Sequence, residues 1–265
     1  MYRSSISERL RKMACSNHLY GFRFLTALVA FFVGPKCALS EQIQLVSPSQ
    51  FADMESQNDL PTIPGSEGSF RGQILYEASD FFSLAGPHLI TQFAWRPNGS
   101  QSESFIVSSE SVLFRLSTTE KTVGNMSSTF DENVGPDEQV VAQNDDPMSI
   151  EYPVVGPPGG PMEFTIISEL TNPFLYDPSQ GNLLLDFIIS SASELPADNV
   201  AVPDPTLTTK WIAGPAEGTT AVLEFGGIIT EFTFAPVPEP CSGVLLCIGL
   251  AAGTSAIRHG KAKRF

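Results

Sequence analysis

Hydrophobic and polar residues alternate along much of the middle of this chain. In residues 110–119, Val112, Phe114 and Leu116 share one face, and the residues between them share the other. A period of two predicts a half-buried β-strand. Further short apolar runs rich in β-branched and aromatic residues occupy 69–78, 88–97, 102–108, 138–143, 162–168, 182–190, 220–227 and 228–236. Gly-, Pro- and Asn-rich turns separate these runs, so the pattern predicts an all-β, antiparallel β-sandwich.

Two local patterns refine this prediction. Residues 79–86 are the one helix candidate, and Gly86-Pro87 should end it. Residues 172–187 predict a strand, a tight turn containing Asp177-Pro178 and Gly181, and a second, buried strand.

The first 40 residues have the pattern of an export signal. A basic stretch is followed by the apolar run 24–33, and Ala38 and Ser40 offer small side chains to signal peptidase. We therefore predict a signal peptide at 1–40, with Met13 as an alternative start. An uncleaved anchor and a lipid-modified Cys37 are the other interpretations.

The last residues predict a single transmembrane helix. Residues 241–257 are uncharged and apolar, and would reach about 25 Å as a helix. The basic residues that follow would stop transfer on the cytoplasmic side and leave the body outside; they are Arg258, His259, Lys261, Lys263 and Arg264.

This tail also resembles a known sorting signal. Val237 is followed by Pro238, Glu239 and Pro240, and then by the apolar segment and the basic end. The arrangement resembles the PEP-CTERM signal of bacteria that produce exopolysaccharide. The resemblance implies a sorting signal at 237–265 that exosortase recognises at Pro238–Pro240. It also implies transient anchoring in the inner membrane, and release to the cell surface or extracellular matrix. A permanent C-terminal anchor is the simpler alternative.

The body at 41–236 has a looser resemblance. Residues 78–97, 116–141 and 172–187 resemble a domain that recurs in PEP-CTERM proteins of planctomycete-type bacteria. The resemblance covers about 66–235 and implies a jelly-roll-like β-sandwich, but no activity.

Charge narrows the possible functions. Residues 41–240 hold 28 of the 29 acidic residues and five of the 15 basic ones, a net charge of −23. Such a field repels phosphate backbones, which argues against nucleic-acid binding. The same region has no cysteine, and its one histidine is His88. This composition excludes a disulfide framework or a cysteine-based zinc site there, and it disfavours a catalytic triad.

Acidic loops are the first candidate site. A calcium ion prefers carboxylate and carbonyl oxygens from flexible loops. The possible ligands are Asp131, Glu132, Asn133, Asp137, Glu138, Asp145 and Asp146. Their spacing does not match an EF-hand, and the sequence favours a solvated loop over a calcium site.

Aromatic residues are the second candidate site, because sugar sites use aromatic faces. The residues considered are Trp95, Trp211, Tyr76, Tyr152 and Tyr176. Trp95 lies in an alternating run and is expected in the core. Trp211 precedes Gly214-Pro215 and is expected to be exposed.

The sequence therefore favours a non-catalytic structural or adhesive role at the cell surface or in the matrix. Exopolysaccharide is a possible partner in that role. The alternative is a carbohydrate- or calcium-binding module, and the third hypothesis is a glycan-active enzyme. No cofactor is expected apart from the possible Ca²⁺.

Overall fold

The computed structural model describes residues 41–56, 69–193, 195–200 and 206–238. These belong to one compact unit, Ser40–Pro238. The predicted signal peptide, its cleavage residues Ala38 and Ser40, the apolar tail and the basic end lie outside the described residues. So do Glu239 and Pro240 of the sorting motif. Within the described ranges, no helix has the length and apolar content that crossing a membrane requires.

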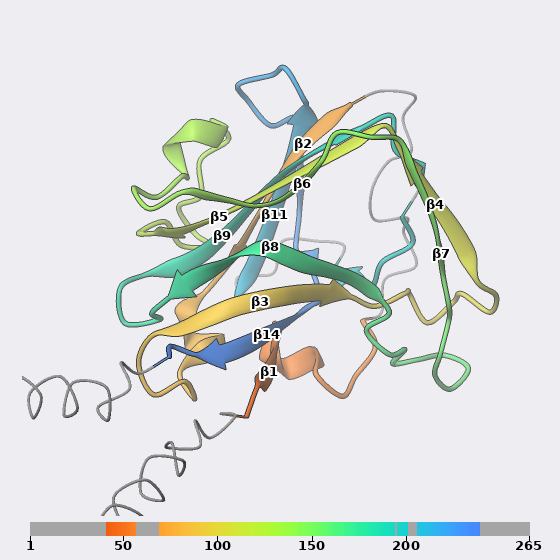
Figure 1. Cartoon of the computed structure of the whole chain (residues 1–265), viewed down its shortest axis with the longest axis horizontal. Coiled ribbons are helices and arrows are strands. Elements are labelled where there is room, and N and C mark those ends of the chain that lie inside the picture. Colours follow the sequence, from red (N-terminus) through yellow and green to blue (C-terminus); the bar gives the residue numbers. More distant parts are fainter. Residues whose placement is uncertain (1–40, 57–68, 194, 201–205, 239–265) are drawn as a thin grey trace, which may run out of the picture. The chain divides into compact units, whose positions relative to one another are not determined.

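The described chain is all-β, with every strand pairing antiparallel, as predicted (Figure 1). One sheet has four strands in the order β1-β14-β3-β8. Its strands are β1 (Ile43–Ser47), β14 (Thr230–Pro236), β3 (His88–Trp95) and β8 (Ile166–Tyr176). Strand β8 therefore forms one edge of this sheet.

The second sheet has six strands in the order β12-β11-β2-β9-β5-β6. Its strands are β12 (Leu223–Phe225), β11 (Thr209–Pro215), β2 (Phe70–Tyr76), β9 (Asn182–Ser190), β5 (Ser111–Thr119) and β6 (Gln139–Asn144). Two short ribbons complete the strands. They are β4 (Phe105–Ser109) with β7 (Met148–Tyr152), and β10 (Asn199–Val200) with β13 (Gly227–Ile228).

Aromatic side chains from the two sheets pack against each other and form the core. Phe93 of the four-stranded sheet and Phe114 of the six-stranded sheet have ring centroids 5.1 Å apart. The rings of Tyr76 and Phe232 are 4.9 Å apart and meet edge to face. Edge-to-face contacts of this kind add stability beyond simple burial. Both hydrophobic clusters consist of residues from this unit, so we expect 41–238 to fold without the rest of the chain.

The outer face of the six-stranded sheet is also covered. The segment between β5 and β6 folds back over it, and Met126 and Phe130 pack on Leu75, Leu184 and Ile212. The acidic run predicted as a solvated loop is therefore a cover for the sheet, with its carboxylates at the surface and Asn133 fully buried.

Several local predictions need correction. Residues 79–86 do not form an α-helix; the chain makes a short 3-10 helix, η3 (Ala78–Phe81), followed by a turn, and this path buries both Phe81 and Leu84 in the core. The other 3-10 helices are η2 (Ser49–Phe51) and η4 (Phe130–Glu132). Strands β1, β7, β10 and β11 were not predicted.

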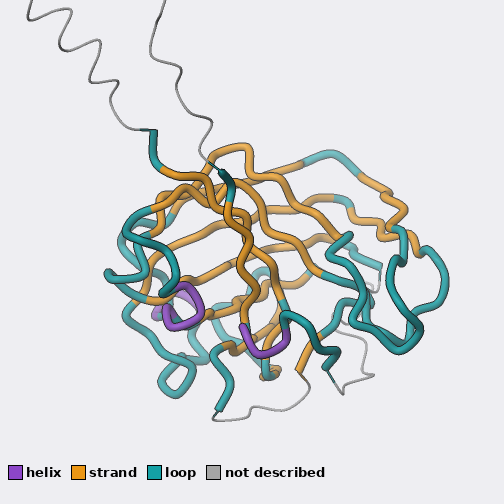
Figure 2. Tube along the Cα trace, turned by 90° about the horizontal axis from the view of Figure 1, so that it is seen from below, coloured by secondary structure: helices purple, strands orange, loops and turns teal. Residues whose placement is uncertain are grey.

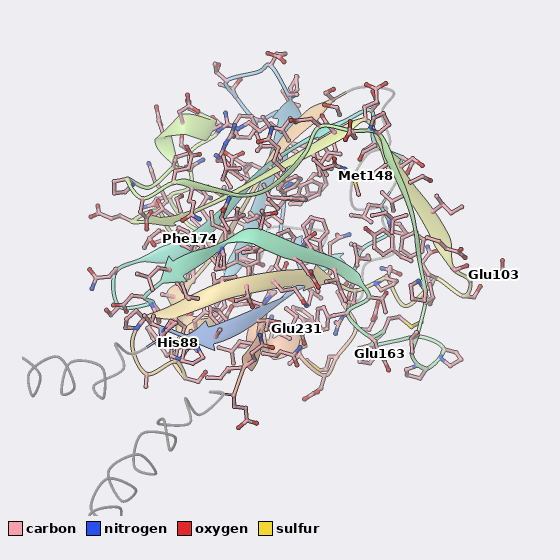
Figure 3. All side chains as sticks on the ribbon, in the orientation of Figure 1. His88, Glu103, Met148, Glu163, Phe174 and Glu231 are labelled. Carbon is pink, nitrogen blue, oxygen red and sulfur yellow. The ribbon has the colours of Figure 1, made fainter. Side chains whose placement is uncertain are left out.

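The described ends of the body lie together. Ile43 pairs with Phe234, so the start of β1 lies beside the end of β14, which Figure 2 shows from below. Pro236 in turn pairs with His88, whereas Trp95 and Thr230 pair at the other end of the same strands. Figure 3 shows the side chains at the two ends of the body, with His88 at one end and Met148 and Glu163 at the other.

Candidate functional site

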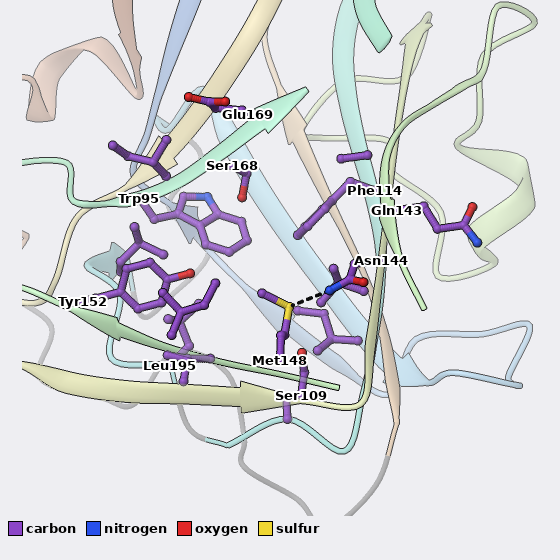
Figure 4. Close-up of a pocket in the computed structure, with 18 of the residues that line it drawn as sticks. Trp95, Ser109, Phe114, Gln143, Asn144, Met148, Tyr152, Ser168, Glu169 and Leu195 are labelled. Atoms are coloured by element: carbon purple, nitrogen blue, oxygen red, sulfur yellow. Dashed lines mark hydrogen bonds between the residues drawn. The ribbon is translucent and has the colours of Figure 1, made fainter. Parts of the chain in front are cut away.

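A pocket opens where the two sheets diverge. Strands β6 and β8 close one side of the sandwich near Val140 and Asn172, whose side-chain amide donates to the Val140 carbonyl over 3.2 Å. Asn172 lies in the bulge that β8 forms opposite Thr91, and beyond this point β6 turns into β7. The space left between them has a volume of about 260 Å³, and the β4–β7 ribbon covers it (Figure 4).

Alternation along the ribbon supplies one wall of the pocket. In β4, Val107 and Ser109 line the cavity, and in β7 Met148, Ile150 and Tyr152 do so. The residues between them, including Glu151, face away. The pairing of Val107 with Ile150 and of Ser109 with Met148 places these inward side chains directly opposite each other.

The core supplies the opposite wall. Trp95 and Phe114 line the pocket from the two sheets, with ring centroids 6.4 Å apart. The indole N–H of Trp95 donates to the Thr230 hydroxyl over 3.0 Å, which fixes the ring. This hydrogen bond holds the Trp95 ring in place at the floor of the pocket.

Polar groups lie at the mouth and on the side of the pocket. Among its lining residues Glu169 alone is charged. The uncharged polar ones besides Tyr152 are Ser109, Gln143, Asn144, Ser168, Thr171 and Ser193. The Asn144 amide approaches the Met148 sulfur at 3.7 Å. Figure 4 shows the Tyr152 hydroxyl pointing into the space. Burial raises the pKa of this phenol, which therefore stays protonated and able to donate at neutral pH.

The Tyr152 hydroxyl is available to a ligand. Its ring packs against Phe105 with centroids 5.9 Å apart. Within the described ranges, this hydroxyl has no hydrogen-bond partner. An apolar chamber with a few polar groups at its edge is the usual form of a small-ligand site.

The predicted calcium ligands do not converge. Asp131 pairs with Arg71 at 3.2 Å, and the Asp137 carboxylate accepts the Thr118 backbone N–H at 2.7 Å. The Asn133 amide donates to Gln73 over 2.9 Å, beneath the loop. In the described part of the chain, no group of three or more His, Cys, Asp or Glu side chains could hold a metal ion.

The remaining predicted ligands are also dispersed. Glu132 accepts the Ser127 hydroxyl at 2.7 Å, and Asp145 accepts the Gln143 amide at 2.9 Å. Asp146 lies in the turn between β6 and β7, and Glu138 is an exposed residue just before β6. These residues are close in sequence, but the length of β6 separates Asp137 and Glu138 at its start from Asp145 and Asp146 at its end.

The prediction for Trp211 was wrong. Its side chain is fully buried and stacks on Phe225, with centroids 4.5 Å apart, so it has no ring face for a sugar. Gly214-Pro215 does not end the strand before it, because β11 continues to Pro215 and pairs with Phe70. Trp95 lies in the core, as expected, while contributing an edge to the pocket. Tyr76 and Tyr176 are fully buried.

Sequence reasoning missed most of the pocket. Tyr152 was considered only as one of several aromatic residues, and Met148 and Ile150 were not singled out. The alternation in 148–152 was a usable signal for β7, but nothing local indicated that β7 leaves the sheet with β4. His88 has a structural role, since its Nδ1 lies 3.0 Å from the Gly86 carbonyl oxygen. No family model, curated protein or solved structure matches this chain.

Proposed function

We propose that the chain is an exported, non-catalytic binding protein with an adhesive role at the bacterial cell surface or in the extracellular matrix. In this proposal a signal peptide directs export, and the PEP-CTERM-like tail anchors the protein until exosortase releases it. A jelly-roll-like body binds the ligand. The resemblance of Pro238–Pro240 and of the residues after them to the sorting signal supports the export and anchoring steps.

The position of the pocket is the observation that carries the binding role. Strand β14 runs from Thr230, which pairs with Trp95 of the pocket floor, to Pro236, where the chain leaves the body. Seven residues of strand cover about 20 Å. A body held by its C-terminal end would therefore present the pocket on the side away from its attachment.

The lining supports a binding role over a catalytic one. A hydrolase of glycans needs two carboxylates facing each other across the substrate. Glu169 is the one carboxylate among the residues that line this pocket. Most of its wall surface is apolar, which suits retention of an apolar group.

Filling the pocket tests the binding role. We expect Ala142→Phe and, from the other wall, Ile150→Trp to reduce the retention of labelled 41–238 on the matrix of the producing bacterium at least fivefold. Val222→Phe adds similar bulk at a fully separate, exposed position and should leave retention unchanged. Equal retention of all four proteins, with melting curves that show them folded, would refute the pocket as the binding site.

Replacing Pro238, Glu239 and Pro240 with alanine in the full chain tests the sorting role. In a host that has exosortase, we expect the protein to accumulate in the membrane fraction at its unprocessed mass. Unchanged release of the alanine variant would show that this motif does not direct sorting.

A further inference from the structure

We propose that the pocket receives an extended, basic peptide segment, which adds as a strand to the free edge of β8 and inserts one large apolar side chain. This inference rests on the proposed binding function and assigns the class of ligand. Three properties of the described residues support it: the geometry of the β8 edge, the volume of the pocket and the distribution of charge.

The pocket runs along the hydrogen-bonding edge of β8. Ile166, Ile167, Ser168 and Glu169 are consecutive, and all four line it. Because successive side chains of a strand point to opposite faces, four consecutive residues line one space only when that space lies along the edge of the strand. Ile167 is 48% exposed at this position.

The edge has backbone groups to offer. Strand β8 pairs with β3 on one side, and no described strand pairs with its other side. Its neighbour β6 is held at the far end by side-chain bonds, from Asn172 to the Val140 carbonyl and from Gln139 to the Asn172 carbonyl. An unpaired edge is a template for β-strand addition, in which the main chain supplies affinity and side-chain pockets supply specificity.

The volume fits one large side chain. A cavity of about 150 Å³ accepts benzene, and sites for drug-sized ligands start at about 300 Å³. The 260 Å³ pocket lies between these, so it accommodates a single aromatic or large aliphatic group. The Tyr152 hydroxyl and the Asn144 amide could then bind a polar atom on that group, such as an indole N–H.

Charge selects a basic segment. Residues 41–240 carry a net charge of −23, and Glu169 lies at the pocket itself. Four of the five basic residues of the body are held in ion pairs with its own carboxylates: Arg71, Arg96, Arg115 and Lys210. An acidic peptide or a second copy of this chain would be repelled, whereas a lysine-rich segment would be attracted.

Fluorescence anisotropy with purified 41–238 tests the proposal. The probe is a labelled nine-residue peptide with lysine and threonine at alternating positions and one central tryptophan. Three altered probes separate the contributions: central alanine in place of tryptophan, glutamate in place of lysine, and N-methyl groups on alternate backbone amides, in both registers. We expect saturable binding of the parent and at least tenfold weaker binding of the alanine and glutamate peptides and of one N-methylated register.

Protein variants place the binding on the pocket. At low salt, Glu169→Lys should weaken binding of the parent peptide about tenfold, because two unit charges change a few ångströms from the lysines. Glu217→Lys makes the same change in the turn between β11 and β12, at the opposite edge of the six-stranded sheet, and should change binding less than twofold. Ala142→Phe should fill the pocket and so remove the difference in affinity between the tryptophan peptide and the alanine peptide.

Each contrary result has a defined meaning. Equal binding of both N-methylated registers and the parent would overturn strand addition, and equal binding of the glutamate peptide would overturn the charge argument. Binding of free indole but of no peptide would replace the peptide with a small aromatic ligand. If no peptide binds while Ala142→Phe still lowers matrix retention, the peptide class fails and the proposed function stands. If retention is unaffected by Ala142→Phe, the proposed function fails instead.

Discussion

Truncation of Trp211 separates a core tryptophan from an exposed binding platform. The side chain is fully buried, stacks on Phe225, and lies so close to Gly72 that a Cβ there would be 2.9 Å from its indole nitrogen. Trp211→Ala should therefore cost about 3–5 kcal/mol, the usual range for buried aromatic residues. An exposed aromatic residue would cost about 0.5 kcal/mol or less.

The size of the body converts this cost into a shift in melting temperature. With about 2.1 cal/mol/K of unfolding entropy per residue, 41–238 has about 0.4 kcal/mol/K in total. The expected fall in melting temperature is thus about 7–12 °C. Trp211→Phe should cost much less, because it keeps a ring and removes an indole N–H that is buried without a partner among the described residues.

Circular dichroism melts of the purified body provide the assay. Phe82→Ala is the matched control, since Phe82 is an aromatic residue with 71% of its surface exposed, and it should shift melting by about 1 °C or less. A Trp211→Ala protein that melts within about 2 °C of the parent would refute the burial argument and restore Trp211 as a surface residue.

Three further predictions concern charge, metal and pH. Asp186→Ala should lower the free energy of unfolding by about 3 kcal/mol in urea titrations, because it leaves Arg71 and Gln73 without their shared buried carboxylate; a change below about 1 kcal/mol would contradict this. Calcium should not raise the melting temperature of 41–238, because the loop carboxylates have separate partners; a rise equivalent to about 2.7 kcal/mol at 100 times Kd would reveal a site. Burial raises the pKa of Tyr152, so the contribution of its neutral phenol to stability is complete below about pH 10 and is lost as pH rises through the folded-state pKa. Tyr152→Phe should therefore reduce the loss of stability at alkaline pH. An equal loss in the variant would show that other groups cause it.

The alternation of side chains predicted the fold class because it is a property of single strands. In β5, Phe114 and Leu116 enter the core as the period of two requires, and Arg115 faces the outer side. Strand β11 was missed because its Gly214-Pro215 resembles a turn, although the proline pairs at the end of the strand. The pocket could not be predicted, because it depends on where β6 leaves β8 and on how β7 pairs with β4. Those are relations between segments far apart in the sequence.

The position of β14 determines how the body would resist mechanical force. This strand is an inner strand, paired with β1 through five residues and with β3 through seven. A pull on Pro236 directed along the strand, opposed by a ligand held near Trp95, loads these hydrogen bonds in shear. In shear the ladders on both sides resist together, whereas bonds at a peeling edge break one after another. In the proposed anchored form, the attachment of the chain and the load path to the pocket would therefore share an inner strand that resists extraction under flow.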